Sequence, residues 1–241
     1  MQLNKEVSPT TADIGSSRQH ILDVATELFS QKGFAATRVD EIARKAEVNK
    51  AMIYYYFPSK EALLDHLIES FFVSLSSAGI SFVQDTFLRL KQEKRLNMFE
   101  DRIEFATEDD LKSFIGETMR YYDVLLNWLL NRRQMVRIIL TESLSDRKHE
   151  GALLKYFVAL EQVTNNPEFA DFAATNYKGG EVFNKFFFTI MPLISFSAYS
   201  ENYVALSGEK LDSLKKHFLS GIMAQSAGYI KGTSIMFQLT T

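Results

Sequence analysis

Residues 33–64 read GFAATRVDEIARKAEVNKAMIYYYFPSKEALL, and this stretch predicts two short helices joined by a tight turn. The hydroxyl of Thr37 can cap the free amides at the start of the first helix. Asn49, another good N-cap, follows only three residues after Ala46, so the chain must turn and begin the second helix at once. This pattern indicates a helix-turn-helix.

The flanking sequence predicts a helix on each side of this pair. Ser16 or Ser17 can cap the earlier helix, and Gly33 ends it. Pro58 stops the second short helix, and Ser59 caps the long helix that follows. Residues 16–60 are therefore expected to form a small helical domain, preceded by a flexible tail over 1–15.

The composition favours a helical protein without disulfides or cysteine chemistry. The chain has 241 residues, no Cys, four Pro and eleven Gly, and its formal net charge is −3. The charge is uneven, because the six basic and three acidic residues of 32–60 give this segment +3. A local basic segment inside an acidic protein is compatible with a nucleic-acid partner. The first residues lack the apolar core of a signal peptide, so the expected location is the cytoplasm.

The stretch 33–64 resembles the N-terminal signature of the TetR family of transcriptional regulators almost end to end. The resemblance covers the Gly-aromatic end of the first helix, the Asp-Glu-Ile-Ala run, the aromatic cluster at 54–57 and the Ser-Lys-Glu start of the fourth helix. It implies an all-α protein with an N-terminal three-helix DNA-binding domain and a larger helical domain, 61–241, for ligand binding and dimerisation. It also implies a repressor that binds a palindromic operator as a dimer and is released by a small molecule.

The second short helix of the pair is expected to enter the major groove of DNA with its first turn. Lys50 can reach a phosphate or a guanine edge, and Ala51 and Met52 can pack on a thymine methyl group. Tyr56 and Phe57 are assigned to the core. The full set of predicted DNA-binding residues is Thr37, Arg38, Asn49, Lys50, Ala51, Met52, Tyr54, Tyr55 and Lys60.

The sequence departs from the family pattern at four positions. Gly is usual in place of Glu47 and Ala51, Thr or a similar residue in place of Met52, and His often in place of Tyr55. Three of these belong to the surface that would read the operator. Glu47 lacks the freedom of Gly at positive φ, which costs the turn about 1 kcal/mol if that conformation is used.

The remainder of the chain reads as a series of amphipathic helices. Thr107 opens a sequence typical of a capping box, and apolar residues follow at three- and four-residue steps. Aromatic residues are frequent in this region, and binding pockets are mostly lined by such side chains. Most of them must be core. The predicted lining of a site for a small, largely apolar effector is Phe105, Tyr122, Trp128, Phe172 and Phe187.

Two late helices, 181–205 and 209–229, are expected to form the dimer interface as a four-helix bundle with their symmetry mates. Their apolar band is too wide for one buried face, and Pro192 should bend the first of them. The alternative is that both helices lie wholly inside one subunit. The predicted interface comprises Phe183, Phe186, Phe187, Ile190, Ile194, Leu214, Phe218 and Ile222.

Other functions receive less support from the residues. No nucleophile, phosphate-binding loop or metal set has its usual spacing, so no enzymatic activity and no cofactor are expected. Asp146, His149 and Glu150 could hold a metal ion, but a polar loop or helix end is the simpler interpretation. The remaining alternative is an architectural DNA-binding protein of the same fold that responds to no ligand.

Overall fold

The computed structural model describes residues 11–98, 103–145, 148–155 and 186–226. Helices account for nearly all of the regular structure in these segments. In chain order the elements are α1 (Thr11–Lys32), α2 (Val39–Lys45), α3 (Lys50–Tyr56), α4 (Lys60–Phe82), the π-helical turn η1 (Val83–Leu88), α5 (Arg89–Gln92), β1 (Leu96–Met98), β2 (Ile103–Phe105), α6 (Glu108–Leu130), α7 (Arg133–Ser143), a second π-helical turn η2 (Phe186–Ile190), α11 (Met191–Ser207) and α12 (Leu211–Ser226).

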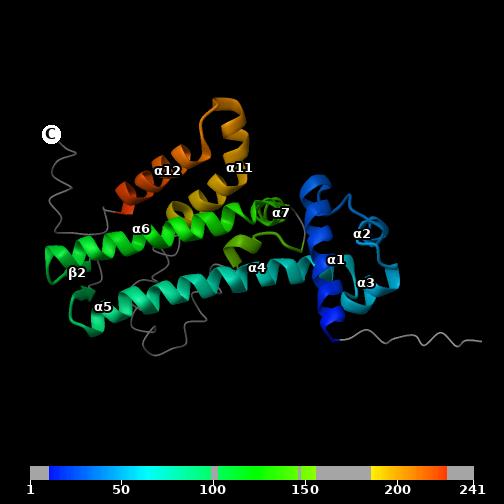
Figure 1. Cartoon of the computed structure of the whole chain (residues 1–241), viewed down its shortest axis with the longest axis horizontal. Helices are drawn as coiled ribbons and strands as arrows, with labels where there is room; N and C mark the ends of the chain where they lie inside the picture. Colours follow the sequence, from blue (N-terminus) through cyan, green and yellow to red (C-terminus); the bar gives the residue numbers. More distant parts are fainter. Residues whose placement is uncertain (1–10, 99–102, 146–147, 156–185, 227–241) are drawn as a thin grey trace, which may run out of the picture.

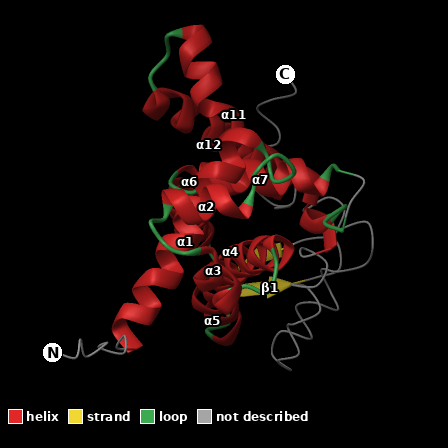
Figure 2. Cartoon of the chain, turned by 90° about the vertical axis from the view of Figure 1, so that its right-hand side faces the viewer, coloured by secondary structure: helices red, strands yellow, loops and turns green. Residues whose placement is uncertain are grey.

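The long helices α4 and α6 form the axis of the molecule. They run side by side, with α1, α2 and α3 at one end and α5 and the β-hairpin at the other (Figure 1). Helices α11 and α12 pack on α6 and reach away from the α4 side. Viewed along this axis, α3 and α4 lie in line, so α4 leads directly from the small helices into the larger part of the chain (Figure 2).

Three of the predicted helix boundaries are confirmed. Gly33, at φ +84°, follows the last residue of α1 in the left-handed conformation that glycine adopts without penalty. Ser59 caps α4, and Thr107 caps α6. The predicted start of the first helix was wrong, because α1 already begins at Thr11, five residues before Ser16.

One continuous hydrophobic core joins the small N-terminal helices to the rest of the chain. Ile21 of α1, Ile53 of α3, Leu64 of α4 and Ile139 of α7 are each at most 2% exposed and belong to this single cluster. Side chains packed this closely transmit a displacement of one helix to its neighbours. The segment 16–60 therefore shares its core with the segment that follows it.

A second, smaller core closes the far end of α4 and α6. Leu90, Leu96 and Phe114 are buried there, with Phe105 packed against them. The antiparallel pair β1–β2, in which Leu96 faces Phe105, was not expected from the sequence. Asp110 accepts a hydrogen bond from Arg95 at 2.6 Å, which ties the hairpin to the first turn of α6.

The break between the two late helices lies close to the predicted one. Gly208, at φ +72°, ends α11. Pro192 lies in the first turn of α11, directly after the π-helical turn η2, a position at which a helix tolerates a residue without an N–H. Residues 181–185 and 227–229 lie outside the described residues.

Several predicted interface residues pack inside the subunit instead. Phe186, Ile194 and Ile222 are at most 6% exposed and belong to the main core, so their assignment to a dimer interface is corrected. The amphipathic pattern identifies a buried face but not whether the same subunit covers it. Phe218 is half-buried and stacks on Phe196, with ring centroids 4.4 Å apart. Ile190 and Leu214 are also half-buried, and Phe183 lies outside the described residues.

Candidate nucleic-acid interface

The turn between α2 and α3 is a Schellman motif. The backbone N–H of Glu47 donates to Arg44 at 3.3 Å, and that of Val48 donates to Ala43 at 3.0 Å. Glu47 has φ +54°, so the left-handed conformation considered for this position is the one that the chain adopts. The turn is therefore tight, as predicted, and carries a residue with a Cβ where glycine fits best.

Helix α3 divides into a buried face and an exposed face. Asn49 caps it as predicted, with Oδ1 accepting from the Met52 N–H at 2.7 Å. Ile53 is buried and Met52 is half-buried, while Tyr54 and Tyr55 are 44% and 76% exposed. The exposed face lies at the end of the molecule, where nothing else in the described chain covers it (Figure 1).

The aromatic cluster after this face is structural, as predicted. Phe57 is 3% exposed and lies under the guanidinium of Arg18, 5.0 Å from its ring centroid. Tyr56 is half-buried against the main core. These two side chains fix the end of α3 on α1 and α4, which leaves Tyr54 and Tyr55 as the aromatic residues that face outward.

Lys50 stands on the exposed face at the first position of α3. Its ammonium lies 2.8 Å from Asp40 of α2, and that hydrogen bond raises the pKa of Lys50 above its usual value. Both side chains are about half exposed or more. A pair this exposed contributes little to stability, so a phosphate group can compete for the lysine.

Thr37 and Lys60 point inward, contrary to the sequence-based assignment. Thr37 is buried and donates to the Gly33 carbonyl at 2.9 Å, and Arg38 rather than Thr37 is the N-cap of α2. The Lys60 ammonium donates to the carbonyls of Phe34 and Thr37 at 2.8 and 2.9 Å and lies 4.3 Å from the Phe34 ring centroid. Both residues therefore hold the α1–α2 turn.

Helix α2 adds two exposed cations near this surface. Arg38 and Arg44 line a shallow groove with Ala36, Asp40 and Glu41. The Glu41 carboxylate accepts from the Arg38 backbone N–H at 3.2 Å and from Lys32 at 2.8 Å, and the Lys32 bond is the main reason that the pKa of Glu41 is lowered. The sequence placed Arg44 in the basic segment, but only the fold places its side chain beside Arg38.

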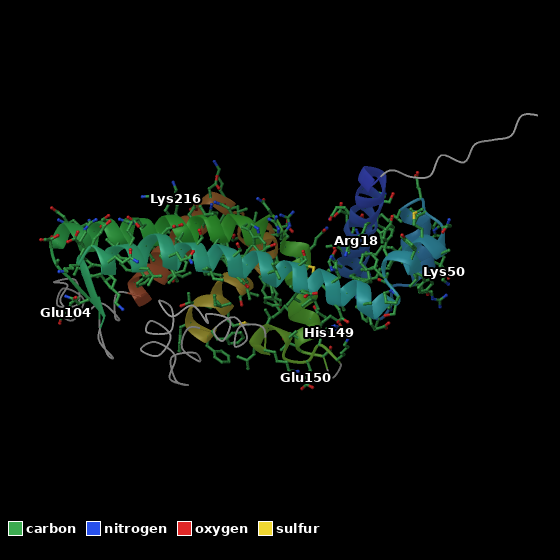
Figure 3. The ribbon with its side chains drawn as sticks, turned by 90° about the horizontal axis from the view of Figure 1, so that it is seen from below. Arg18, Lys50, Glu104, His149, Glu150 and Lys216 are labelled. Carbon is green, nitrogen blue, oxygen red and sulfur yellow. The ribbon has the colours of Figure 1, made fainter. Side chains whose placement is uncertain are left out.

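A polar cluster lies behind the helix-turn-helix, where α4 meets the rest of the chain. Asp65 of α4 binds both Lys148 and His149 of the loop after α7, with His149 Nε2 2.7 Å from Asp65 Oδ1. Burial alone would raise the pKa of Asp65, but these two hydrogen bonds lower it. Figure 3 shows His149 beside α4, far along the chain from the residues that it contacts. Sequence reasoning missed this cluster.

His66, the next residue of α4, accepts from Arg18 of α1 at 3.0 Å. This bond requires a neutral imidazole with its proton on Nδ1. Burial, followed by the nearby Arg18 charge, lowers the pKa of His66 from its ordinary value of 6.5. Arg18, Phe57, Asp65 and His66 line a groove of about 290 Å³ between α1 and α4.

The four predicted effector residues that lie in the described part of the chain do not share one site. Phe105 belongs to the distal core, Trp128 packs on Phe71 with ring centroids 5.0 Å apart, and Tyr122 packs on the main core. Phe187 is 45% exposed, and Phe172 lies outside the described residues. The structure therefore does not bring the four described side chains together.

Comparison with known proteins also identifies the segment that contains α2 and α3 as a helix-turn-helix. Residues 21–67 match the family model described as bacterial regulatory proteins, tetR family. The probable HTH-type transcriptional regulator YttP of Bacillus subtilis is 27% identical over 149 residues, or 59% of this chain and 72% of YttP. The HTH-type transcriptional repressor NicS of Pseudomonas putida is 40% identical over 62 residues, or 26% of this chain and 29% of NicS.

The helix-turn-helix segment belongs to the TetR family. The chain is a transcriptional regulator with a helix-turn-helix DNA-binding domain. Salmonella enterica GusR shares its fold, with a TM-score of 0.54 at 18% identity over 95% of this chain and 100% of GusR. The matching relatives are regulators, which are generally non-enzymatic.

Two further properties of this chain concern metals and membranes. No group of three metal-binding side chains occurs among the described residues; His149 binds Asp65, and Asp146 lies outside those residues. The continuous helix Lys60–Gln92 is long and apolar enough to cross a membrane by length and composition. A single helix of this kind is weak evidence, because core helices of soluble proteins pass the same test. Its first half packs in the main core through Leu63, Leu64 and Ile68.

Proposed function

We propose that this chain is a repressor that binds a palindromic operator as a homodimer and releases it when a small molecule binds. The division of α3 supports this proposal most strongly. Its buried side, through Ile53, fixes the helix on the core, while Lys50, Ala51, Tyr54 and Tyr55 remain exposed together. A recognition helix needs this combination of a rigid back and a free first turn.

Each exposed residue has a distinct proposed contact. Lys50 leaves Asp40 for a phosphate or a guanine edge, and Ala51 packs on a thymine methyl. The hydroxyls of Tyr54 and Tyr55 donate to phosphate oxygens, as does the guanidinium of Arg38. The half-buried Met52 reaches the groove only at its tip.

We assign dimerisation to α11 and α12, with a corrected set of contacts. Tyr199, Tyr203 and Leu206 lie four and three residues apart on α11 and are 62%, 55% and 88% exposed. This spacing places them on one face, and apolar groups this exposed favour a protein contact. A palindromic operator requires two recognition helices about 34 Å apart, which a second subunit supplies.

The proposed effector is a small, largely apolar molecule bound by the helical domain, and the proposed location is the cytoplasm, where the operator is. An alternative is an architectural protein that responds to no effector. The scattered positions of Phe105, Trp128 and Phe187 favour that alternative. A thermal-shift screen of small molecules, followed by DNA-binding assays of each stabilising compound, separates the two. Compounds that stabilise the protein and leave DNA affinity unchanged support the alternative.

Selection from a random duplex library with the full chain tests the proposed function. We expect the enriched duplexes to share a palindrome whose half-sites are about one helical turn apart or a multiple of it. A reporter gene placed behind that palindrome should be repressed. Failure to enrich any sequence would refute operator binding, and activation of the reporter would refute repression.

A further inference from the structure

The loop after α7 contacts α4 through Lys148 and His149, and the His149 side chain also reaches the α1–α2 turn. The His149 side chain is 10% exposed. The side chain of its neighbour Lys148, which binds the same Asp65 carboxylate, is 65% exposed. The His149 ring also stands edge-on to Phe34, with centroids 6.5 Å apart and planes 82° apart. His149 thus touches both the first part of α4 and the α1–α2 turn.

Phe34 contacts several elements of the N-terminal helical segment at once. It is 8% exposed, packs edge-on against Phe29 of α1 and lies under the Lys60 ammonium. Its carbonyl oxygen accepts from the same ammonium at 2.8 Å. A displacement of Phe34 therefore moves the turn that precedes α2 relative to the start of α4.

The other end of this loop is fixed to α7. The Gly151 N–H donates to the Ser143 carbonyl at 2.8 Å, and the Leu153 N–H donates to the Ser143 hydroxyl at 3.2 Å. Gly151 has φ +66°, a conformation that a side chain would strain. The Ala152 N–H donates to the His149 carbonyl at 2.9 Å, so the backbone at His149 follows the end of α7.

We infer that His149 is a positioning residue for DNA binding, which sets the helix-turn-helix relative to α7 by holding Asp65 on one side and Phe34 on the other. The inference rests on the proposed operator binding. His149 makes no contact with DNA in this arrangement and acts through α4 and the α1–α2 turn. The helical domain thereby has a polar connection to the reading helices, separate from the apolar contact of α1 with α7.

The experiment measures operator affinity for full-length variants, using a duplex enriched by the wild-type chain. His149→Ala should lower affinity by at least about fivefold, the lower end of typical coupling between sites. The slope of affinity against salt concentration should stay unchanged, because no phosphate contact is lost. Lys148→Met is the matched control, since it removes the exposed partner of the same carboxylate, and it should stay within about twofold of wild type.

A double-mutant cycle separates positioning from a merely structural role. His149→Ala and Asp65→Ala should be non-additive in operator affinity at a temperature where circular dichroism shows every variant folded. His149→Gln, which can still donate to Asp65, should recover part of the affinity, and it replaces His149→Ala in the cycle if that variant does not fold. Wild-type affinity in a folded His149→Ala variant would overturn the inference alone. A wild-type chain that enriches no duplex would overturn the proposed function as well.

Discussion

Replacing Glu47 with glycine should stabilise the protein. Glu47 holds φ +54° at the residue that follows the α2 C-cap, and a residue with a Cβ pays about 1–2 kcal/mol there. Glycine adopts this φ without that conformational cost, but its greater loss of backbone entropy on folding costs about 0.4–1 kcal/mol. The net gain in the free energy of unfolding is therefore about 0.5–1 kcal/mol.

The measurement is urea-induced unfolding followed by circular dichroism. In thermal unfolding, a gain of about 1 kcal/mol corresponds to roughly 2–4 °C in the midpoint for a chain of this size. Glu47→Ala is the control, because it removes the same charge and keeps the Cβ. It should not stabilise the protein. Equal midpoints for the glycine and alanine variants would show that backbone strain at this turn does not limit stability.

Three further outcomes are expected. Lys50→Met should lower the slope of operator affinity against salt concentration by about one unit. Lys60→Met should mainly lower the unfolding midpoint, because the Lys60 ammonium donates to the turn carbonyls. Equal salt slopes for the two variants would contradict these assignments. The lowered pKa of His66 means that the folded state binds fewer protons than the unfolded state, so stability should fall as the pH drops below about 6.5. His66→Gln should flatten that part of a urea-unfolding series, and a parallel loss in both proteins would argue against this origin. Tyr203→Glu should yield folded monomers in sedimentation, and an undisturbed dimer would exclude this face of α11.

The helix-turn-helix was predictable from the sequence because its signals are local. Asn49, Ser59 and Gly33 each satisfy or end a helix within a few residues of themselves. The positive φ at Glu47 was raised by the family resemblance, in which glycine is usual at this position, and the structure adopts it. The family resemblance rests on this segment, and so does the assignment to DNA binding.

The tertiary structure decided which side chains are free to act. Lys60 has the sequence context of a surface lysine, but its ammonium donates to the carbonyls of Phe34 and Thr37 in the α1–α2 turn. Asp65 and His149 are 84 positions apart, and no local pattern pairs them. Ile194 lies on an apolar helix face like that of an interface, yet the core of its own subunit covers it. Local sequence indicates where most of these helices begin or end, whereas the partner of each face depends on packing between distant segments.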